Sequence, residues 1–254
     1  MQANRRNLIS VAVVGSLFLG ITIVGFVGNA KTGNYVATPI LLTAVGIAVI
    51  FFWLSQFRVR QMLQEKTPRR LIAHYHKTVR RIPDADAAIA YLCALVATFF
   101  GDFDQARKEL EPVNWDTTRP MYKGHRLYVL ALMAILEEND YAKANRLTAQ
   151  ARELEARDAA GGFELLDGAI RLVAGGLDAD ELDQVFPKLE KSAGRAVGLV
   201  PGIAAWAVAL HYHRQNKSDK ATEYKEMLRS AVPHCLPLRP TTGPVAETPV
   251  DNRN

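Results

Sequence analysis

Residues 101–110 have the sequence GDFDQARKEL, in which an aromatic residue follows the glycine by two positions and an alanine follows three positions later. Residues 139–148, NDYAKANRLT, repeat this pattern with asparagine in place of glycine. Fainter copies occur at 176–182, GLDADEL, and at 216–225, NKSDKATEYK. Ala106, Ala144, Glu181 and Ala221 occupy the same position in the four copies and are 38, 37 and 40 residues apart, a period typical of stacked structural repeats.

The segments between these copies are apolar runs with helical periodicity, and no alternating strand pattern interrupts them. Glycine and asparagine are the residues that most readily adopt the left-handed turn that ends a helix. One helical hairpin cannot bury its apolar face alone, so neighbouring hairpins must stack and share a core. We therefore predict an all-α fold, with about four helix pairs forming a repeat domain over residues 83–236.

The motif at 101–110 resembles that of tetratricopeptide repeats, with Gly101, a following aromatic residue and Ala106. The resemblance covers roughly residues 84–230 and implies an α-solenoid whose first helices line a concave, partner-binding surface. Carried over position by position, it implies that four side chains contact a protein partner: Tyr91, Arg126, Trp206 and His213. An alternative for the two aromatic residues is a core position that bridges neighbouring hairpins.

Residues 8–28 and 38–57 contain no ionisable side chain, and each is long enough to cross a bilayer as a helix. We predict a transmembrane hairpin joined by an external loop at 29–37. Lys and Arg are concentrated at the two ends of this hairpin, in residues 1–7 and 58–81. Both termini are therefore expected in the cytoplasm, and the protein at the inner membrane. A removed signal peptide is the alternative.

Ala12, Ser16 and Gly20 place small side chains on one face of the first predicted span. This face would pack the two spans together or, alternatively, mediate homo-oligomerisation. An N-terminal membrane hairpin ahead of helical repeats is similar in architecture to the haem-biosynthesis-associated HemY membrane proteins, which implies a membrane-bound assembly factor.

Residues 58–81 hold eight Lys or Arg against Glu65 alone, whereas residues 82–254 hold 20 basic and 25 acidic residues. The excess of basic residues therefore lies beside the predicted membrane, which argues against a nucleic-acid-binding domain. We predict a basic juxtamembrane helix within 58–82, interrupted at Pro68. Its arginines would contact lipid headgroups; they are Arg58, Arg60, Arg69, Arg70, Arg80 and Arg81. Alternatively, its apolar stripe packs under the following domain.

Cys93 and Cys235 form no C-x-x-C pair, and we expect a buried thiol at Cys93 and a surface thiol at Cys235. The last residues, 237–254, are rich in proline and lack aromatic residues, which predicts a disordered tail.

The pairs His74/His76 and His211/His213 have a spacing of two, which puts the rings on opposite sides of a helix and disfavours a shared metal ion. The acidic residues of 178–183 are expected at a helix N-terminus. We predict no catalytic residue, no metal ligand and no cofactor.

Three hypotheses for function follow. The first is a membrane-anchored scaffold whose cytoplasmic repeats bind a protein partner. The second is a structural or biogenesis subunit that packs into a larger membrane complex through its hairpin. The third is an enzyme whose catalytic residues form no recognisable motif.

Overall fold

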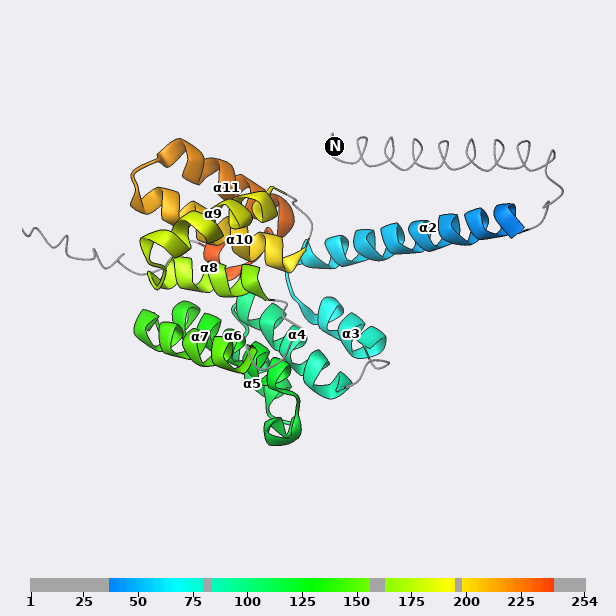
Figure 1. The fold of residues 1–254 in the computed structure, drawn as a ribbon, viewed down its shortest axis with the longest axis horizontal. Helices are drawn as coiled ribbons and strands as arrows, with labels where there is room; N and C mark the ends of the chain where they lie inside the picture. The colour runs from blue at the N-terminus through cyan, green and yellow to red at the C-terminus, as the bar shows by residue number, and fades with distance from the viewer. Residues whose placement is uncertain (1–36, 80–83, 156–162, 195–197, 240–254) are drawn as a thin grey trace, which may run out of the picture. The chain divides into compact units, whose positions relative to one another are not determined.

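The computed structural model describes residues 37–79, 84–155, 163–194 and 198–239, and over these ranges its regular structure is entirely helical (Figure 1). The all-α prediction is therefore confirmed for the described residues. The helices are α2 (Ala37–Leu63), α3 (Arg69–Thr78), α4 (Ala85–Phe99), α5 (Phe103–Leu110), α6 (Pro120–Leu136), α7 (Tyr141–Glu155), α8 (Glu164–Ala174), α9 (Ala179–Ala193), α10 (Leu199–Arg214) and α11 (Ser218–Ala231). Two short 3₁₀ turns, η2 (Trp115–Thr117) and η3 (Leu236–Leu238), complete the set. The chain divides into two compact units after Arg58; within the second unit, residues 84–239, which contain α4 to α11 and η3, are called the hairpin domain below.

Consecutive helices of the hairpin domain form antiparallel pairs: α4 packs with α5, α6 with α7, α8 with α9, and α10 with α11 (Figure 1). The first helix of each pair also contacts the first helix of the next pair. In addition, α7 packs on α8 and α9 packs on α10. This order of contacts is that of four hairpins stacked in sequence.

Each hairpin turn contains one residue with a left-handed backbone. These residues are Gly101, Asn139, Gly175 and Asn216, with φ angles of 76°, 55°, 70° and 58°. After Gly101, Gly175 and Asn216, the next residue donates its backbone N–H to a carbonyl five residues earlier, at 2.9, 2.8 and 3.0 Å. The sequence pattern pointed to Gly176 in the third turn, whereas the left-handed residue is Gly175.

The second helices begin at aspartates in three of the four hairpins. Asp102, Asp140 and Asp178 each accept a hydrogen bond from the backbone N–H three residues later, at 3.2, 2.7 and 2.8 Å. Asp178 and Glu181 form a complete capping box, which confirms that the acidic residues of 178–183 lie at a helix N-terminus. The aligned alanines Ala106 and Ala144 are both fully buried.

The first helices α4 and α10 are buried on nearly all sides, and their apolar sequences explain why. The ring of Phe99 in α4 lies 6.1 Å from that of Trp206 in α10, so the first hairpin contacts the last. The Arg239 guanidinium also donates a hydrogen bond to the carbonyl of Phe100 at 2.7 Å. Most residues of α4 and α10 are therefore buried rather than exposed.

Within residues 233–239 Cys235 is buried and the other side chains are half-buried or exposed, and this segment corrects two expectations. Cys235 is buried rather than on the surface, and the 3₁₀ turn η3 packs its Leu236 near Gly101. The chain is therefore ordered through Arg239, beyond the predicted start of the tail at 237. Residues 240–254 lie outside the described residues.

Among the residues that the structure describes, no helix combines the length and the apolar character needed to cross a membrane. The predicted span 8–28, with Ala12, Ser16 and Gly20, and most of the predicted loop 29–37 lie outside the described residues. The segment 38–57 falls within α2 and stays a prediction as a membrane span. Large apolar side chains of α2 are exposed; they are Val45, Ile47, Ile50, Trp53, Leu54 and Phe57.

The predicted break at Pro68 is confirmed, since α2 ends at Leu63 and α3 begins at Arg69. Leu71 and Ile72 of α3 are buried, and α3 packs on α4. The apolar stripe of this segment therefore lies against the hairpin domain, as the alternative in the sequence analysis proposed. The arginines Arg58, Arg69 and Arg70 are exposed and Arg60 is half-buried, whereas Arg80 and Arg81 lie outside the described residues.

Candidate functional site

Two of the four side chains expected to bind a partner are instead in the core. Tyr91 is only 9% exposed, and its ring lies 4.7 Å from that of His125 and 5.7 Å from that of Phe163. Trp206 is 7% exposed and packs against Phe99 of the first hairpin. Both residues are core positions, as the alternative from the sequence had it; Tyr91 contacts the next hairpin, whereas Trp206 contacts the first hairpin rather than a neighbouring one.

The other two expected side chains are more accessible, but they lie in different places. The Arg126 guanidinium lies 5.3 Å from the centre of the Trp115 ring, and the Trp115 indole N–H donates to the Leu110 carbonyl at 2.9 Å. Arg126 is half-buried, and its contact with the Trp115 ring holds the loop after α5 in place. The sequence did not indicate this role. His213 is exposed near the end of α10.

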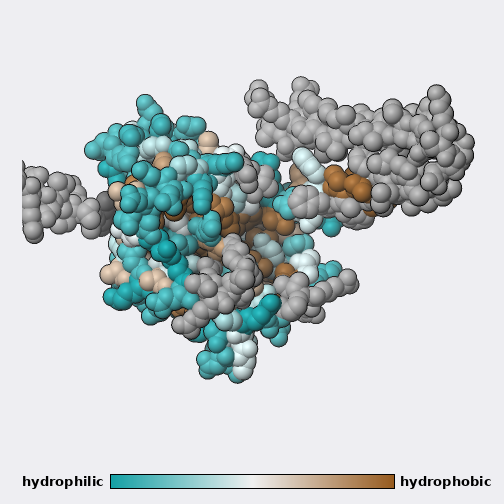
Figure 2. Space-filling model, viewed as in Figure 1, coloured by the Kyte–Doolittle hydropathy of each residue, from teal (hydrophilic) through white to brown (hydrophobic). Residues whose placement is uncertain are grey.

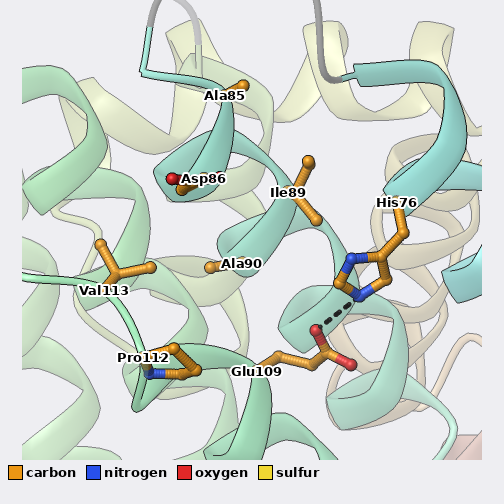
Figure 3. A pocket seen from close by; sticks show the side chains of 8 residues that line it. All are labelled: His76, Ala85, Asp86, Ile89, Ala90, Glu109, Pro112 and Val113. Carbon is orange, nitrogen blue, oxygen red and sulfur yellow. Dashed lines mark hydrogen bonds and ion pairs between the residues drawn. The ribbon is translucent and has the colours of Figure 1, made fainter.

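A pocket of about 520 Å³ opens beside α3, α4 and α5 (Figure 3). Its wall is apolar at the loop after α5 and, apart from Asp86, near the start of α4, and it is polar where α3 faces α5. The lining residues are His76, Ala85, Asp86, Ile89, Ala90, Glu109, Pro112 and Val113.

The polar end of the pocket is a histidine–carboxylate pair. Nε2 of His76 in α3 lies 3.0 Å from Oε2 of Glu109 in α5 (Figure 3). The other carboxylate oxygen of Glu109 accepts a hydrogen bond from the Gln105 side-chain amide at 2.6 Å. The Glu109 side chain is 9% exposed and that of His76 is 46% exposed, so the pair lies at the boundary between core and solvent.

The thiol of Cys93 lies close to this pair. It is fully buried in α4, and its Sγ contacts the Ile72 carbonyl at 3.8 Å. Burial raises the pKa of the Cys93 thiol to about 12, and the negative charge of Glu109 adds to the effect. A thiol with such a pKa keeps its proton near neutral pH and is a poor nucleophile.

Three potential ligand atoms lie within 4.8 Å of one another, one each from His76, Cys93 and Glu109. In the described part of the chain, no other group of three histidine, cysteine or acidic side chains is arranged to hold a metal ion. No local sequence signal marks this cluster, because its members come from three different helices and follow no short motif. Only the packing of α3 on α4 and of α4 on α5 brings them together.

The fold and this pocket define an all-α protein of stacked helical hairpins. Comparison with known protein families, characterised proteins and solved structures finds no match for this chain.

Proposed function

We propose that this protein is a membrane-anchored scaffold, in which residues 8–28 and 38–57 form the anchor and the hairpin domain binds a protein partner in the cytoplasm. One observation carries the proposal: the exposed large apolar side chains of the described residues are concentrated on α2. Six of them lie between Val45 and Phe57, whereas Tyr141 is the one in the hairpin domain. Six exposed large apolar side chains on one helix need an apolar environment, and a bilayer supplies one.

The hairpin domain has the character of a binding module built from helical repeats, as the tetratricopeptide resemblance implies. Its first helices supply the core, and the outward surfaces of α9 and α11 are largely hydrophilic (Figure 2). A partner would meet the second helices and the ends of the first. Tyr141, which is 41% exposed at the start of α7, offers apolar contact area in place of the buried Tyr91 and Trp206.

The second candidate function is that of a structural or biogenesis subunit of a larger membrane complex. The exposed apolar side chains of α2 favour this function equally, because a neighbouring membrane protein covers such side chains as well as lipid does. Exchanging residues 1–57 for an unrelated transmembrane hairpin separates the two functions. A scaffold retains the protein that co-purifies in mild detergent, whereas a subunit held through its own hairpin loses it.

The topology of the anchor is tested with reporter fusions in the full chain. The bias of Lys and Arg predicts that a reporter inserted at Gly33 is external and that one fused after Asn254 is cytoplasmic. An external reporter after Asn254 would contradict the proposal, and a chain released from membranes by alkaline carbonate would contradict the anchor itself.

A further inference from the structure

We propose that His76, Cys93 and Glu109 form a zinc site that links α3 to the first hairpin, with its fourth coordination position facing the pocket. The three residues supply an imidazole nitrogen, a sulfur and a carboxylate oxygen, each from a different helix. Zinc accepts all three kinds of ligand, and sites with three protein ligands keep one position for water or another small ligand.

The distances suit a tetrahedral ion after small movements. With bonds of about 2.0–2.3 Å, the ligands of zinc are roughly 3.3–3.8 Å apart. His76 and Glu109 are now 3.0 Å apart, so they would separate slightly, and no pair in the cluster exceeds 4.8 Å. The His76 side chain is half-exposed, so its ring has more room to move than the fully buried Cys93.

The charges of the cluster also match a divalent ion. With the Cys93 proton released to solvent, one thiolate and one carboxylate balance the charge of Zn²⁺, and the neutral imidazole adds none. A sulfur ligand disfavours Mg²⁺ and Ca²⁺, which prefer sets of oxygen ligands. The hydrogen bond from Gln105 to the second oxygen of Glu109 would orient the carboxylate, as outer partners of metal ligands do.

The position of the cluster gives the ion a structural consequence. Since α3 is joined to the hairpin domain through few buried side chains, a metal bond from His76 would fix α3 against α4 and α5. His76 and Glu109 line the pocket directly, so the remaining coordination position points to a space that solvent can enter (Figure 3).

The test uses the full chain in detergent micelles, titrated with Co²⁺ as a spectroscopic substitute for zinc. The expected result is a saturable near-ultraviolet band from sulfur-to-cobalt charge transfer, together with visible bands of four-coordinate cobalt, which Zn²⁺ abolishes. Cys93→Ser should remove the charge-transfer band, and His76→Ala should weaken cobalt binding at least tenfold.

Matched controls are available in the same chain. Cys235→Ser removes the other buried thiol and His74→Ala removes a histidine from the same helix, and both should leave the spectrum unchanged. Glu109→Gln keeps the size of the side chain, so a folded variant of this kind tests the carboxylate if Cys93→Ser fails to fold. The proposal is overturned if the unmodified chain gives no charge-transfer band, or if Cys235→Ser removes it.

Discussion

Gly101 and Gly175 hold the same left-handed position in two hairpin turns, but their surroundings differ. Their φ angles are 76° and 70°, a region that costs an L-residue with a side chain about 1–2 kcal/mol. A Cβ atom at Gly101 would lie 3.2 Å from Cδ1 of Leu236, whereas one at Gly175 would meet nothing within 4 Å. Comparing substitutions at the two positions therefore separates the cost of backbone strain from the cost of steric crowding against Leu236.

We expect Gly175→Ala to lower the free energy of unfolding by about 1 kcal/mol and Gly101→Ala to lower it by about 2 kcal/mol or more. The additional loss at 101 comes from displacing Leu236 and the segment after α11. Chemical denaturation of the two variants measures the difference. Asn139→Gly serves as a control, since it relaxes the same backbone position, and it should be neutral or slightly stabilising. Equal losses at 101 and 175 would contradict the contact with Leu236.

Glu181 should make the stability of the fold depend on pH, because its hydrogen-bond partners change its pKa. Arg171 donates a hydrogen bond to the Glu181 carboxylate, and this bond lowers the pKa of Glu181, with a further contribution from the Asp178 backbone N–H. A carboxyl group whose pKa is lower in the folded state stabilises the fold above its unfolded pKa of about 4.3, and this stabilisation disappears as the pH falls through the folded value.

Glu181→Gln should therefore lower the melting temperature near pH 7, and its effect should disappear as the pH falls through the lowered folded pKa of Glu181. Glutamine keeps the capping-box geometry, so the change removes mainly the charge. Asp180→Asn, at the exposed neighbouring position of the same helix turn, is the matched control and should change the melting temperature little. A deficit for Glu181→Gln that is as large at acid pH as at neutral pH would rule out the charge as its source.

At the scale of the helix, α3 has two separate faces with different roles. Leu71 and Ile72 are buried against the hairpin domain, so they are not available to insert into a lipid headgroup layer. Arg69 and Arg70 remain exposed, the latter with its guanidinium 2.6 Å from the Glu65 carboxylate. Any contact of α3 with a membrane would then be electrostatic.

For residues 59–254, we expect binding to vesicles that contain anionic lipid to weaken when Arg69 and Arg70 are both changed to Gln. Each arginine contributes about 1 kcal/mol near an anionic surface, so the pair should account for roughly a 30-fold change in the partition coefficient. Salt should weaken the unmodified fragment in the same way. Binding that persists at high salt would show that apolar insertion, rather than charge, holds the fragment.

The hairpins could be predicted from the sequence because their signals are local. Gly101 and Asn139 end helices through their own backbone preference, and Asp102 and Asp140 begin the next helices through bonds to residues three positions later. The contact between Phe99 and Trp206 has no local signal, since it depends on how the successive hairpins stack. The cluster of His76, Cys93 and Glu109 at the pocket also lacks a local signal, because its residues meet only after α3, α4 and α5 have packed.

At the scale of the whole domain, contacts between the first and last hairpins should stabilise both of them. In an open stack of repeats, damage to the last repeat affects mainly its neighbour. Here the bond from Arg239 to the Phe100 carbonyl and the packing of Leu236 near Gly101 connect residues 233–239 to the first hairpin. Stability should therefore be shared between the two ends of the domain.

Ending the chain after Val232 should lower the free energy of unfolding by roughly 2–4 kcal/mol, because it removes the buried Cys235, the side chain of Leu236 and the Arg239 hydrogen bond. A chain that ends at Arg239 is the reference. Hydrogen exchange measured on both should show faster exchange at the end of α4 in the shorter chain. Faster exchange restricted to α10 and α11 would instead indicate an open stack.

The bond between Arg239 and Phe100 joins residues 139 positions apart, and a ribosome makes them in that order. At about 5–20 residues per second, roughly 7–28 s pass between the synthesis of the first hairpin and that of the segment that covers it. During this interval the side chain of Phe99 lacks its partner Trp206 for most of the time. Apolar surface exposed in this way favours aggregation and chaperone binding. The first hairpin to be synthesised therefore spends the longest time without its complete native contacts.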